Sequence, residues 1–406
     1  MSSAGLEMIW SATWIAPSRA AAEKPSDKNP WIANDTNSSL EQPHATADNV
    51  VEAVNNDQSF ASLSGAHVRY RSSNPRVATV SSSGQVTAVA HGAATISVTV
   101  NGVTGSAPIV VQQSFTLTAP PVVTPGSTVT VTTALPATGS KPLTNVSVTL
   151  AAPSGWTVTA TSPSTFATVA PGQTAQTRWN VTVPAGATAG SNQLTATATF
   201  TDANGSGTVS APAQVSVPFA SLADAFGNPG ISDDSNTSAG NLDGGGFSYS
   251  AQALAGAGLT PGATITHDGV TFTWPNAQPG TSDNVVAGGQ TIAMSGSGTT
   301  LGLVGTGDYG TASGTGTVIY TDGTTEPFTL TFPDWWANTT PPGGDILARA
   351  SYINTPTGKQ NQNVSVYDAG VPLQAGKTVK YVTLPDVSQG ATQGQTAMHI
   401  FAMGIG

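Results

Sequence analysis

Two adjacent tryptophans, Trp335 and Trp336, offer the clearest binding chemistry in the sequence. They stand between Asp334 and Asn338, and a Pro-Pro-Gly-Gly loop follows at 341–344. Sugar rings stack their C–H faces on aromatic rings, while neighbouring carboxylate and amide groups bind the hydroxyls. If this segment is a strand, the two rings point to opposite faces, so at most one belongs to the core. We therefore predict a carbohydrate-binding site made of these four residues. The alternative is that both rings seal the edge of a β-sandwich.

A second group of residues is rich in the oxygen ligands that hard cations prefer. Asp233, Asp234 and Asn236 follow one another closely, and Asp243 comes shortly after them. Calcium takes about six to eight oxygen ligands from loops of this kind, although the spacing of an EF-hand is absent. We predict a structural calcium site from these four residues and no other cofactor. The alternative is a solvated turn capped by its own Asp and Asn side chains.

Catalytic chemistry has a weaker basis. His267 and His399 are far apart in the sequence, and no G-x-S-x-G, H-E-x-x-H or Walker pattern occurs. A Ser-His-Asp triad is recognised by its geometry rather than its spacing, so the sequence leaves a hidden hydrolytic site open. No catalytic residue is predicted.

The acidic and basic residues are divided along the chain in a way that marks domains. From residue 58 to 201 there is no Asp or Glu, and from 179 to 347 there is no Lys or Arg. Glycoside hydrolysis generally needs two carboxylates beside the scissile bond. Any such pair must therefore come from the last part of the chain. The acids and the missing bases around the tryptophans disfavour an anionic polymer, so the expected ligand is a neutral glycan or polysaccharide.

Composition indicates an exported β protein. Charged residues make up 8% of the 406 residues, cysteine is absent, and the formal net charge is −10. The absence of cysteine excludes disulfides and thiol catalysis, and the negative charge disfavours nucleic acid as a partner. No apolar run approaches the ~18–20 residues of a membrane helix. The first residues do not form a convincing signal peptide. We expect a secreted or cell-surface fragment whose export signal is not visible in this chain.

Short strands with alternating apolar and polar residues fill residues 70–100. The sequences VATV, VTAV and ISVTV are separated by the turn signals Asn74-Pro75, Ser83-Gly84 and His91-Gly92. The order S-S-N-P-x-V-A-T-V, G-x-V-T-A-V and G-x-A-T-I-S-V resembles the bacterial Ig-like group 2 domain over about residues 65–111. The resemblance implies a spacer or adhesive module.

A second set of alternating strands occupies residues 113–217. The pieces V-x-P-G-S-T-V-T-V, P-S-G-W-T-V and V-A-P-G-Q-T-A-Q-T-R-W-N-V-T-V resemble the Ig-like domain associated with bacterial alpha-galactosidases and other glycosidases. Their spacing also favours an antiparallel sandwich. Trp156 and Trp179 are candidate sugar platforms, but both lie in alternating strands, so we expect them in the core.

The last part, 218–406, is richer in Gly, Asp and aromatic residues, and its strand candidates predict one larger β-sandwich of the jelly-roll type. Its final run, G-K-T-V-K-Y-V-T-L-P followed by M-H-I-F-A-M, resembles the closing strands of jelly-roll domains appended to secreted bacterial hydrolases.

The sequence thus predicts an all-β chain of tandem Ig-like sandwiches followed by a jelly-roll-like sandwich. The predicted boundaries are an irregular segment over 1–46, then modules over 47–112, 113–217 and 218–406. The resemblances imply a non-catalytic accessory region of a secreted bacterial glycoside hydrolase, which spaces an upstream catalytic domain and binds glycan. Two alternatives stay open: glycoside or ester hydrolysis by the last module, and a purely structural spacer or adhesin.

Overall fold

The computed structural model describes residues 31–35, 39–40, 46–48, 50–54, 60–61, 65–100 and 102–406. Most of the segment predicted to be irregular, 1–46, lies outside the described residues. The chain divides into two compact units. The first unit consists of Met1–Pro120, Thr128–Pro184 and Gln193–Gln214, and the second of Pro121–Ser127, Ala185–Asn192 and Val215–Gly406.

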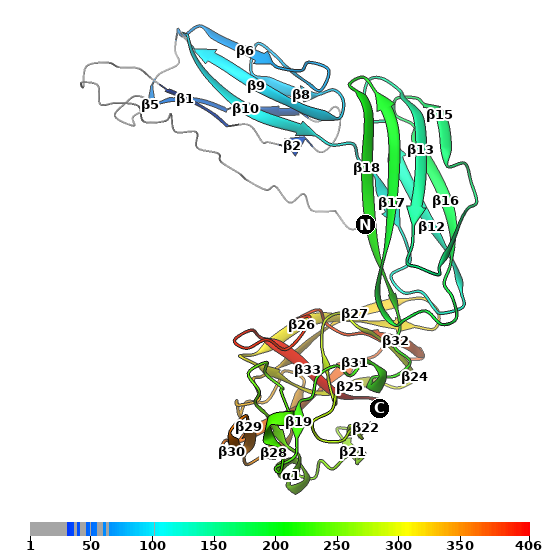
Figure 1. Cartoon of the computed structure of the whole chain (residues 1–406), viewed down its shortest axis with the longest axis vertical. Helices are drawn as coiled ribbons and strands as arrows, with labels where there is room; N and C mark the ends of the chain where they lie inside the picture. The colour runs from blue at the N-terminus through cyan, green and yellow to red at the C-terminus, as the bar shows by residue number, and fades with distance from the viewer. Residues whose placement is uncertain are drawn as a thin grey trace, which may run out of the picture. The chain divides into compact units, whose positions relative to one another are not determined.

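The first module of the first unit is built from short strands (Figure 1). They are β1 (Trp31–Asp35), β2 (Ser39–Leu40), β3 (Thr46–Asp48), β4 (Val50–Val54), β5 (Phe60–Ala61), β6 (Val68–Ser72), β7 (Ala78–Val80), β8 (Gln85–Ala88), β9 (Gly92–Val100) and β10 (Val103–Val111). They pair in the orders β1-β4-β5, β2-β10-β9-β6 and β3-β8-β7. Side chains alternate between the two faces of a strand, and in β9 every second one from Ala94 to Val100 is buried.

The second module, most of which belongs to the first unit, is a two-sheet sandwich. Its strands are β11 (Thr116–Thr118), β12 (Thr128–Pro136), β13 (Leu143–Ala151), β14 (Thr157–Ala160), β15 (Thr165–Val169), β16 (Thr174–Thr182), β17 (Gly190–Asp202) and β18 (Gly205–Val217). One sheet has the order β11-β12-β16-β14 and the other β15-β13-β17-β18. Trp179 is buried, and its indole N–H donates to Thr133 Oγ1 at 3.2 Å. Trp179 is therefore a core residue, as expected, whereas Trp156 is half-buried and precedes β14.

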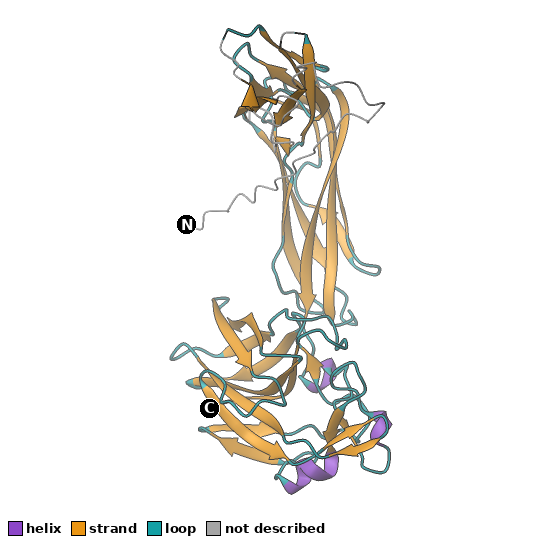
Figure 2. Ribbon diagram, turned by 90° about the vertical axis from the view of Figure 1, so that its left-hand side faces the viewer, coloured by secondary structure: helices purple, strands orange, loops and turns teal. Residues whose placement is uncertain are grey.

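The second unit holds all the helical segments of the described chain (Figure 2). Its elements are η1 (Ala223–Ala225), β19 (Ile231–Ser232), η2 (Thr237–Ala239), β20 (Ser248–Ser250), α1 (Ala251–Gly256), β21 (Thr264–His267), β22 (Val270–Thr273), β23 (Val285–Val286), β24 (Thr291–Gly296), β25 (Thr300–Asp308), β26 (Ala312–Tyr320), β27 (Thr325–Phe332), β28 (Gly344–Ala350), β29 (Ile353–Thr355), β30 (Gly358–Gln360), β31 (Val364–Pro372), β32 (Val379–Thr383) and β33 (Ala397–Ile405). None of the helices in the described residues is long and apolar enough to span a bilayer.

Eight strands of this unit form a jelly roll. One sheet has the order β23-β33-β25-β31-β28 and the other β24-β32-β26-β27. The antiparallel pairs β23·β33, β24·β32, β25·β31 and β26·β27 are nested one inside the next. Such nesting is what a long hairpin gives when it is rolled into two facing sheets. The predicted jelly-roll sandwich is confirmed, with β28 as an additional edge strand.

The five-stranded sheet of the jelly roll is buried on both faces. Between the two sheets lies a core that includes Leu303, Phe332 and Met398. On the opposite face a second core packs beneath α1 and the β21–β22 hairpin, with Trp274 and Phe401 stacked at 5.1 Å. As a result β25, β31 and β33 are buried along most of their lengths. Polar side chains on these strands therefore lie in enclosed surroundings.

Candidate functional site

The two adjacent tryptophans lie in a turn that follows β27, not in a strand. The Trp335 N–H donates to the carbonyl of Gly307 at 2.8 Å, and the Ala337 N–H donates to the carbonyl of Asp334 at 2.8 Å. The extended geometry assumed from the sequence is therefore wrong. The turn still separates the rings, because Trp335 is 3% exposed and Trp336 is 40% exposed.

Trp335 is held in the second core. Its ring meets Tyr249 edge-on, with the ring centroids 5.0 Å apart, and its carbonyl accepts the N–H of Ser365 at 2.7 Å. The ring of Trp336 is tilted by 60° to that of Trp335, with centroids 6.2 Å apart. The buried ring of Trp335 therefore anchors the turn that carries the exposed ring of Trp336.

The exposed ring borders a cleft of about 300 Å³, which is lined by Asp243, Phe247, Tyr309, Asp334, Trp335 and Trp336. Tyr309 follows the end of β25 and is 39% exposed. Its φ of 46° lies in the left-handed region, which a bulky residue seldom adopts. Thr396 Oγ1 donates to the carbonyl of Tyr309 at 2.9 Å, and this contact helps to hold the unusual conformation.

Two carboxylates fix the backbone around the cleft. Asp334 accepts the Gly310 N–H at 2.7 Å and the Trp336 N–H at 2.8 Å, so one side chain joins the segments that carry both exposed rings. Asp243 accepts the N–H groups of Gly245 and Phe247 at 2.8 and 3.0 Å. These contacts position aromatic rings, and they already use oxygens of both carboxylates.

The phenol of Tyr309 connects the two sides of the cleft. Its hydroxyl donates to Asp243 Oδ2 at 3.3 Å. Burial, followed by the nearby Asp243 carboxylate, raises the pKa of Tyr309 above its usual value. The phenol therefore stays protonated at neutral pH and keeps a hydroxyl for hydrogen bonding.

Of the four residues predicted to bind carbohydrate, the structure brings three together. Asp334, Trp335 and Trp336 line the cleft. Asn338 is exposed and lines a neighbouring open hollow with Asp345 and Arg349 instead. Tyr309 and Phe247 are not among the residues expected from the sequence, and Asp243 was expected at the cation site. For Tyr309, the signal in the sequence is its position between Asp308 and Gly310, at the end of a strand.

Each of the three aspartates predicted to bind a hard cation has hydrogen-bond donors of its own. Asp233 accepts from the Ser235 N–H and hydroxyl at 2.8 and 2.6 Å and from Gln252 Nε2 at 2.6 Å. These hydrogen bonds, those of Ser235 first, lower the pKa of Asp233. Asn236 is exposed nearby.

Asp234 is also surrounded by donors. It accepts from Tyr352 Oη at 2.8 Å and pairs with Lys359 Nζ at 3.2 Å, and Asp243 lies in the aromatic cleft. The calcium site stays a prediction, and binding there would have to displace some of these donors.

Each of the two histidines singled out from the sequence has an aspartate partner. His399 and Asp308 are fully buried, with Nε2 and Oδ2 3.6 Å apart, and His399 Nδ1 is 2.8 Å from Asn284 Oδ1. A substrate cannot reach a fully buried pair. His267 contacts Asp368 in a partly open hollow.

Three family models match successive parts of the chain. Residues 45–111 match the bacterial Ig-like domain (group 2), and residues 123–201 match the NPCBM-associated, NEW3 domain of alpha-galactosidase. Residues 214–403 match the AziU2-like β-sandwich domain. The two Ig-like resemblances are confirmed, and so is the all-β architecture. No curated protein matches the chain.

Solved structures show weak likenesses. Domains 4 and 5 of the S-layer protein SbsC are 19% identical, with 47% of this chain and 97% of that chain covered and a TM-score of 0.19. The secreted serine protease VesC from Vibrio cholerae is 8% identical, with 72% and 50% covered and a TM-score of 0.27. A family 123 glycoside hydrolase from Clostridium perfringens is 13% identical, with 28% and 25% covered and a TM-score of 0.19. The chain spans 24% of the longer S-layer protein rSbsC(31-844). TM-scores this low do not support any inference about function.

Proposed function

We propose that the chain is a non-catalytic accessory region of a secreted or cell-surface bacterial glycoside hydrolase. In this proposal the two Ig-like modules space the catalytic domain, and the cleft beside Trp336 binds a neutral glycan. The match of residues 123–201 to a domain of alpha-galactosidase supports the association with a glycoside hydrolase.

One observation carries the glycan assignment. Among the described side chains, the large hydrophobic ones left exposed are Val110, Tyr309 and Trp336, and the two aromatic ones line the same cleft. A soluble domain seldom leaves such rings exposed together without a use for them. Flat rings at the wall of a cleft suit the C–H faces of a pyranose, because aromatic side chains combine a large apolar surface with few rotatable bonds.

The polar groups of the cleft favour a neutral ligand. Asp243 and Asp334 are its charged lining residues, and no Lys or Arg lines it. Carboxylate oxygens can accept hydrogen bonds from sugar hydroxyls, but they repel carboxylate or sulfate groups on a polymer. A neutral polysaccharide is therefore the expected partner.

The same contacts argue against hydrolysis in this cleft. A glycosidase needs one carboxyl group that can hand over a proton and a second that attacks or activates water. Asp334 accepts backbone N–H groups on both of its oxygens, and Asp243 accepts two on Oδ1 and the Tyr309 hydroxyl on Oδ2. These hydrogen bonds engage the oxygens that a general acid or a nucleophile would use, so the arrangement suits the binding of hydroxyl groups better than hydrolysis.

Affinity gel electrophoresis tests this proposal. The full chain is run through gels that contain galactomannan, xylan, β-glucan or a sulfated polymer. We expect at least one neutral polymer to retard the wild type and the sulfated polymer not to do so. Trp336→Ala should lose most of the retardation. The matched control is Trp156→Ala, which removes a half-buried indole from the first unit and should migrate like the wild type.

If the wild type and Trp336→Ala migrate alike on every polymer, the glycan assignment is wrong and the chain is a structural spacer or adhesin. Hydrolysis of aryl glycosides by the purified chain, measured as release of the phenol and abolished by Asp334→Asn or Asp243→Asn, would instead show that the cleft is catalytic.

A further inference from the structure

A hairpin next to the jelly roll brings an imidazole and two carboxylates together in a second hollow, away from the aromatic cleft. The hairpin consists of β21 and β22, joined by the two-residue turn Asp268-Gly269. Both turn residues have positive φ, 46° and 79°. Two-residue hairpin turns of this twist require positive φ at both positions, and Asp-Gly is one of the sequences that provide it. The turn therefore fixes His267 and Asp268 side by side at the hairpin tip.

Close packing against the sheet places this tip. The hairpin lies over glycines of the neighbouring strands: a side chain at Gly302 of β25 would collide with Phe272, and one at Gly404 of β33 would collide with the carbonyl of Thr271. Glycine at such positions permits the approach of another backbone. The tip consequently reaches β31, whose Asp368 pairs in register with Val304 of β25.

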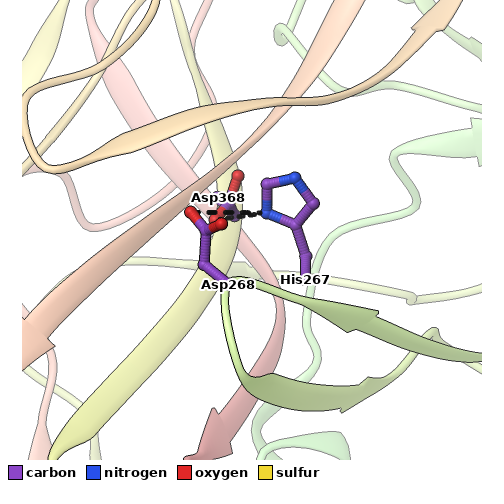
Figure 3. A group of neighbouring side chains, drawn as sticks. All are labelled: His267, Asp268 and Asp368. Atoms are coloured by element: carbon purple, nitrogen blue, oxygen red, sulfur yellow. Dashed lines mark hydrogen bonds and ion pairs between the residues drawn. The ribbon is translucent and has the colours of Figure 1, made fainter.

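The three side chains converge (Figure 3). His267 Nδ1 is 3.1 Å from Asp368 Oδ2 and 3.7 Å from Asp268 Oδ2. One ligand atom from each residue lies within 4.8 Å of the other two. They border a hollow of about 270 Å³ whose other lining residues are uncharged, among them Thr299, Thr300 and Gly343.

The charges in this hollow are poorly balanced. Asp368 is 4% exposed, and its polar contacts are the imidazole of His267 at 3.1 Å and the N–H of Asp345, which donates to Oδ1 at 3.3 Å. No Lys or Arg lines the hollow. The two carboxylates therefore have the single imidazole of His267 between them. A buried carboxylate is usually paired with a full cation or binds a metal.

We propose that His267, Asp268 and Asp368 bind a divalent transition-metal ion of the zinc type. Around a tetrahedral ion with bonds of ~2.1 Å, ligand atoms lie roughly 3.4 Å apart. The two distances from His267 Nδ1, 3.1 and 3.7 Å, bracket that separation. The hollow leaves room for water or a ligand oxygen at the fourth position.

The donor set selects the class of metal. An imidazole nitrogen with two carboxylate oxygens suits zinc and its neighbours among the transition metals. Calcium and magnesium prefer larger, all-oxygen sets. The ion would join the hairpin tip to β31 and thereby add a second attachment to a two-stranded element, which is marginal without packing partners. This site is independent of the glycan cleft and of the predicted calcium loop.

Titration of the full chain with the metal alone tests the site. The protein carries no histidine tag, is treated with EDTA and dialysed, and is titrated calorimetrically with Zn²⁺, while its melting temperature is recorded with and without Zn²⁺. We expect one Zn²⁺ to bind per chain and the melting temperature of the second unit to rise, since a ligand that binds only the folded state stabilises it.

Three variants remove one ligand each: His267→Ala, Asp268→Asn and Asp368→Asn. Asp268→Asn is the decisive one, because its side chain is 72% exposed and Asn also tolerates the positive φ of the turn. Each variant should weaken Zn²⁺ binding by about tenfold or more. The matched control is Asp322→Asn, at another turn of the same unit, which should bind like the wild type.

Two results would overturn the proposal. One is a wild type that shows no saturable Zn²⁺ binding and no change in melting temperature. The other is equal binding by the wild type, Asp268→Asn and His267→Ala, which would place any bound Zn²⁺ elsewhere on the chain and leave the three side chains as a simple ion-pair cluster.

Discussion

At the scale of single residues, Trp335 and Trp336 have the same side chain but different surroundings. Trp335 packs against Tyr249 in the second core, whereas Trp336 stands at the cleft. The difference arises from the turn at Asp334, whose carboxylate accepts the Trp336 N–H. The local backbone therefore decides which ring contributes to stability and which is available to a ligand.

This difference predicts unequal effects of the two alanine substitutions on stability. Trp335→Ala leaves a large cavity and should lower the free energy of unfolding of the second unit by about 3–5 kcal/mol. Trp336→Ala should change the free energy of unfolding by at most about 1 kcal/mol, because its ring is 40% exposed. Urea denaturation followed by circular dichroism measures both. Equal losses for the two variants would contradict the assignment of one ring to the core.

A second residue-scale prediction concerns Asp283, which is 1% exposed. It accepts the N–H groups of Gly230 and Ile231 at 2.9 Å each, yet burial outweighs these bonds and raises the pKa of Asp283 to about 7. The folded state thus keeps a proton that the unfolded chain releases above pH ~4. The resulting stabilisation is present below pH ~4 and is lost as the pH rises to about 7.

The measurement is the unfolding free energy of the second unit between pH 4 and 8. Asp368 also has a raised pKa, so the comparison is between the wild type and Asp283→Asn. Asparagine has one side-chain oxygen in place of two, so the variant loses an acceptor for a backbone N–H at every pH. Its free energy of unfolding should nevertheless decline less between pH 4 and 7 than that of the wild type. Parallel curves would mean that Asp283 does not titrate in this range.

At the scale of elements, local patterns predicted the strands better than their pairing. The alternating runs at 317–320 and 328–332 lie within β26 and β27, because period-two alternation follows from the geometry of a strand. The nested order of the jelly roll depends on pairs such as β23·β33, which join residues more than a hundred positions apart. Local alternation holds no information on such pairs, so only the likeness to jelly-roll proteins indicated the topology.

The candidate cleft was only partly predictable for the same reason. Asp334 and the tryptophans are neighbours in sequence, so their clustering was visible. Tyr309 reaches the cleft because β25 ends beside the turn after β27, where Gly307 and Asp334 form a bridge. Asp368 was not singled out, since a buried acid in an apolar strand becomes notable only when the hairpin tip with His267 is placed against it.

The loop that contains Asp233, Asp234 and Asn236 gives the element-scale prediction. If it binds calcium together with Asp243, an excess of Ca²⁺ should raise the melting temperature of the EDTA-treated chain by mass action, and Asp233→Asn should remove the rise. Asp268→Asn is the control, because it affects only the proposed zinc site. An unchanged melting temperature would mean that Ser235, Gln252 and Lys359 satisfy these carboxylates without a cation.

At the scale of the whole molecule, the proposed binding sites lie in the second unit. The stretch from residue 58 to 201, most of which belongs to the first unit, contains no Asp or Glu, and its Trp179 is buried in a sandwich core. The second unit contains the aromatic cleft and the histidine–aspartate cluster. This division agrees with the proposed roles, in which the Ig-like modules space the catalytic domain and the jelly-roll domain binds the glycan.

Calorimetric titration of the full chain with an oligosaccharide of the polymer that retards it most is the most direct test of the glycan-binding proposal. We predict saturable binding by the wild type and by Trp156→Ala. Binding by Trp336→Ala should be weaker by about 1–3 kcal/mol, on the scale of aromatic stacking with nucleobases, which corresponds to roughly 5- to 150-fold in Kd. Equal affinities for the wild type and Trp336→Ala, with both proteins folded, would contradict the proposal.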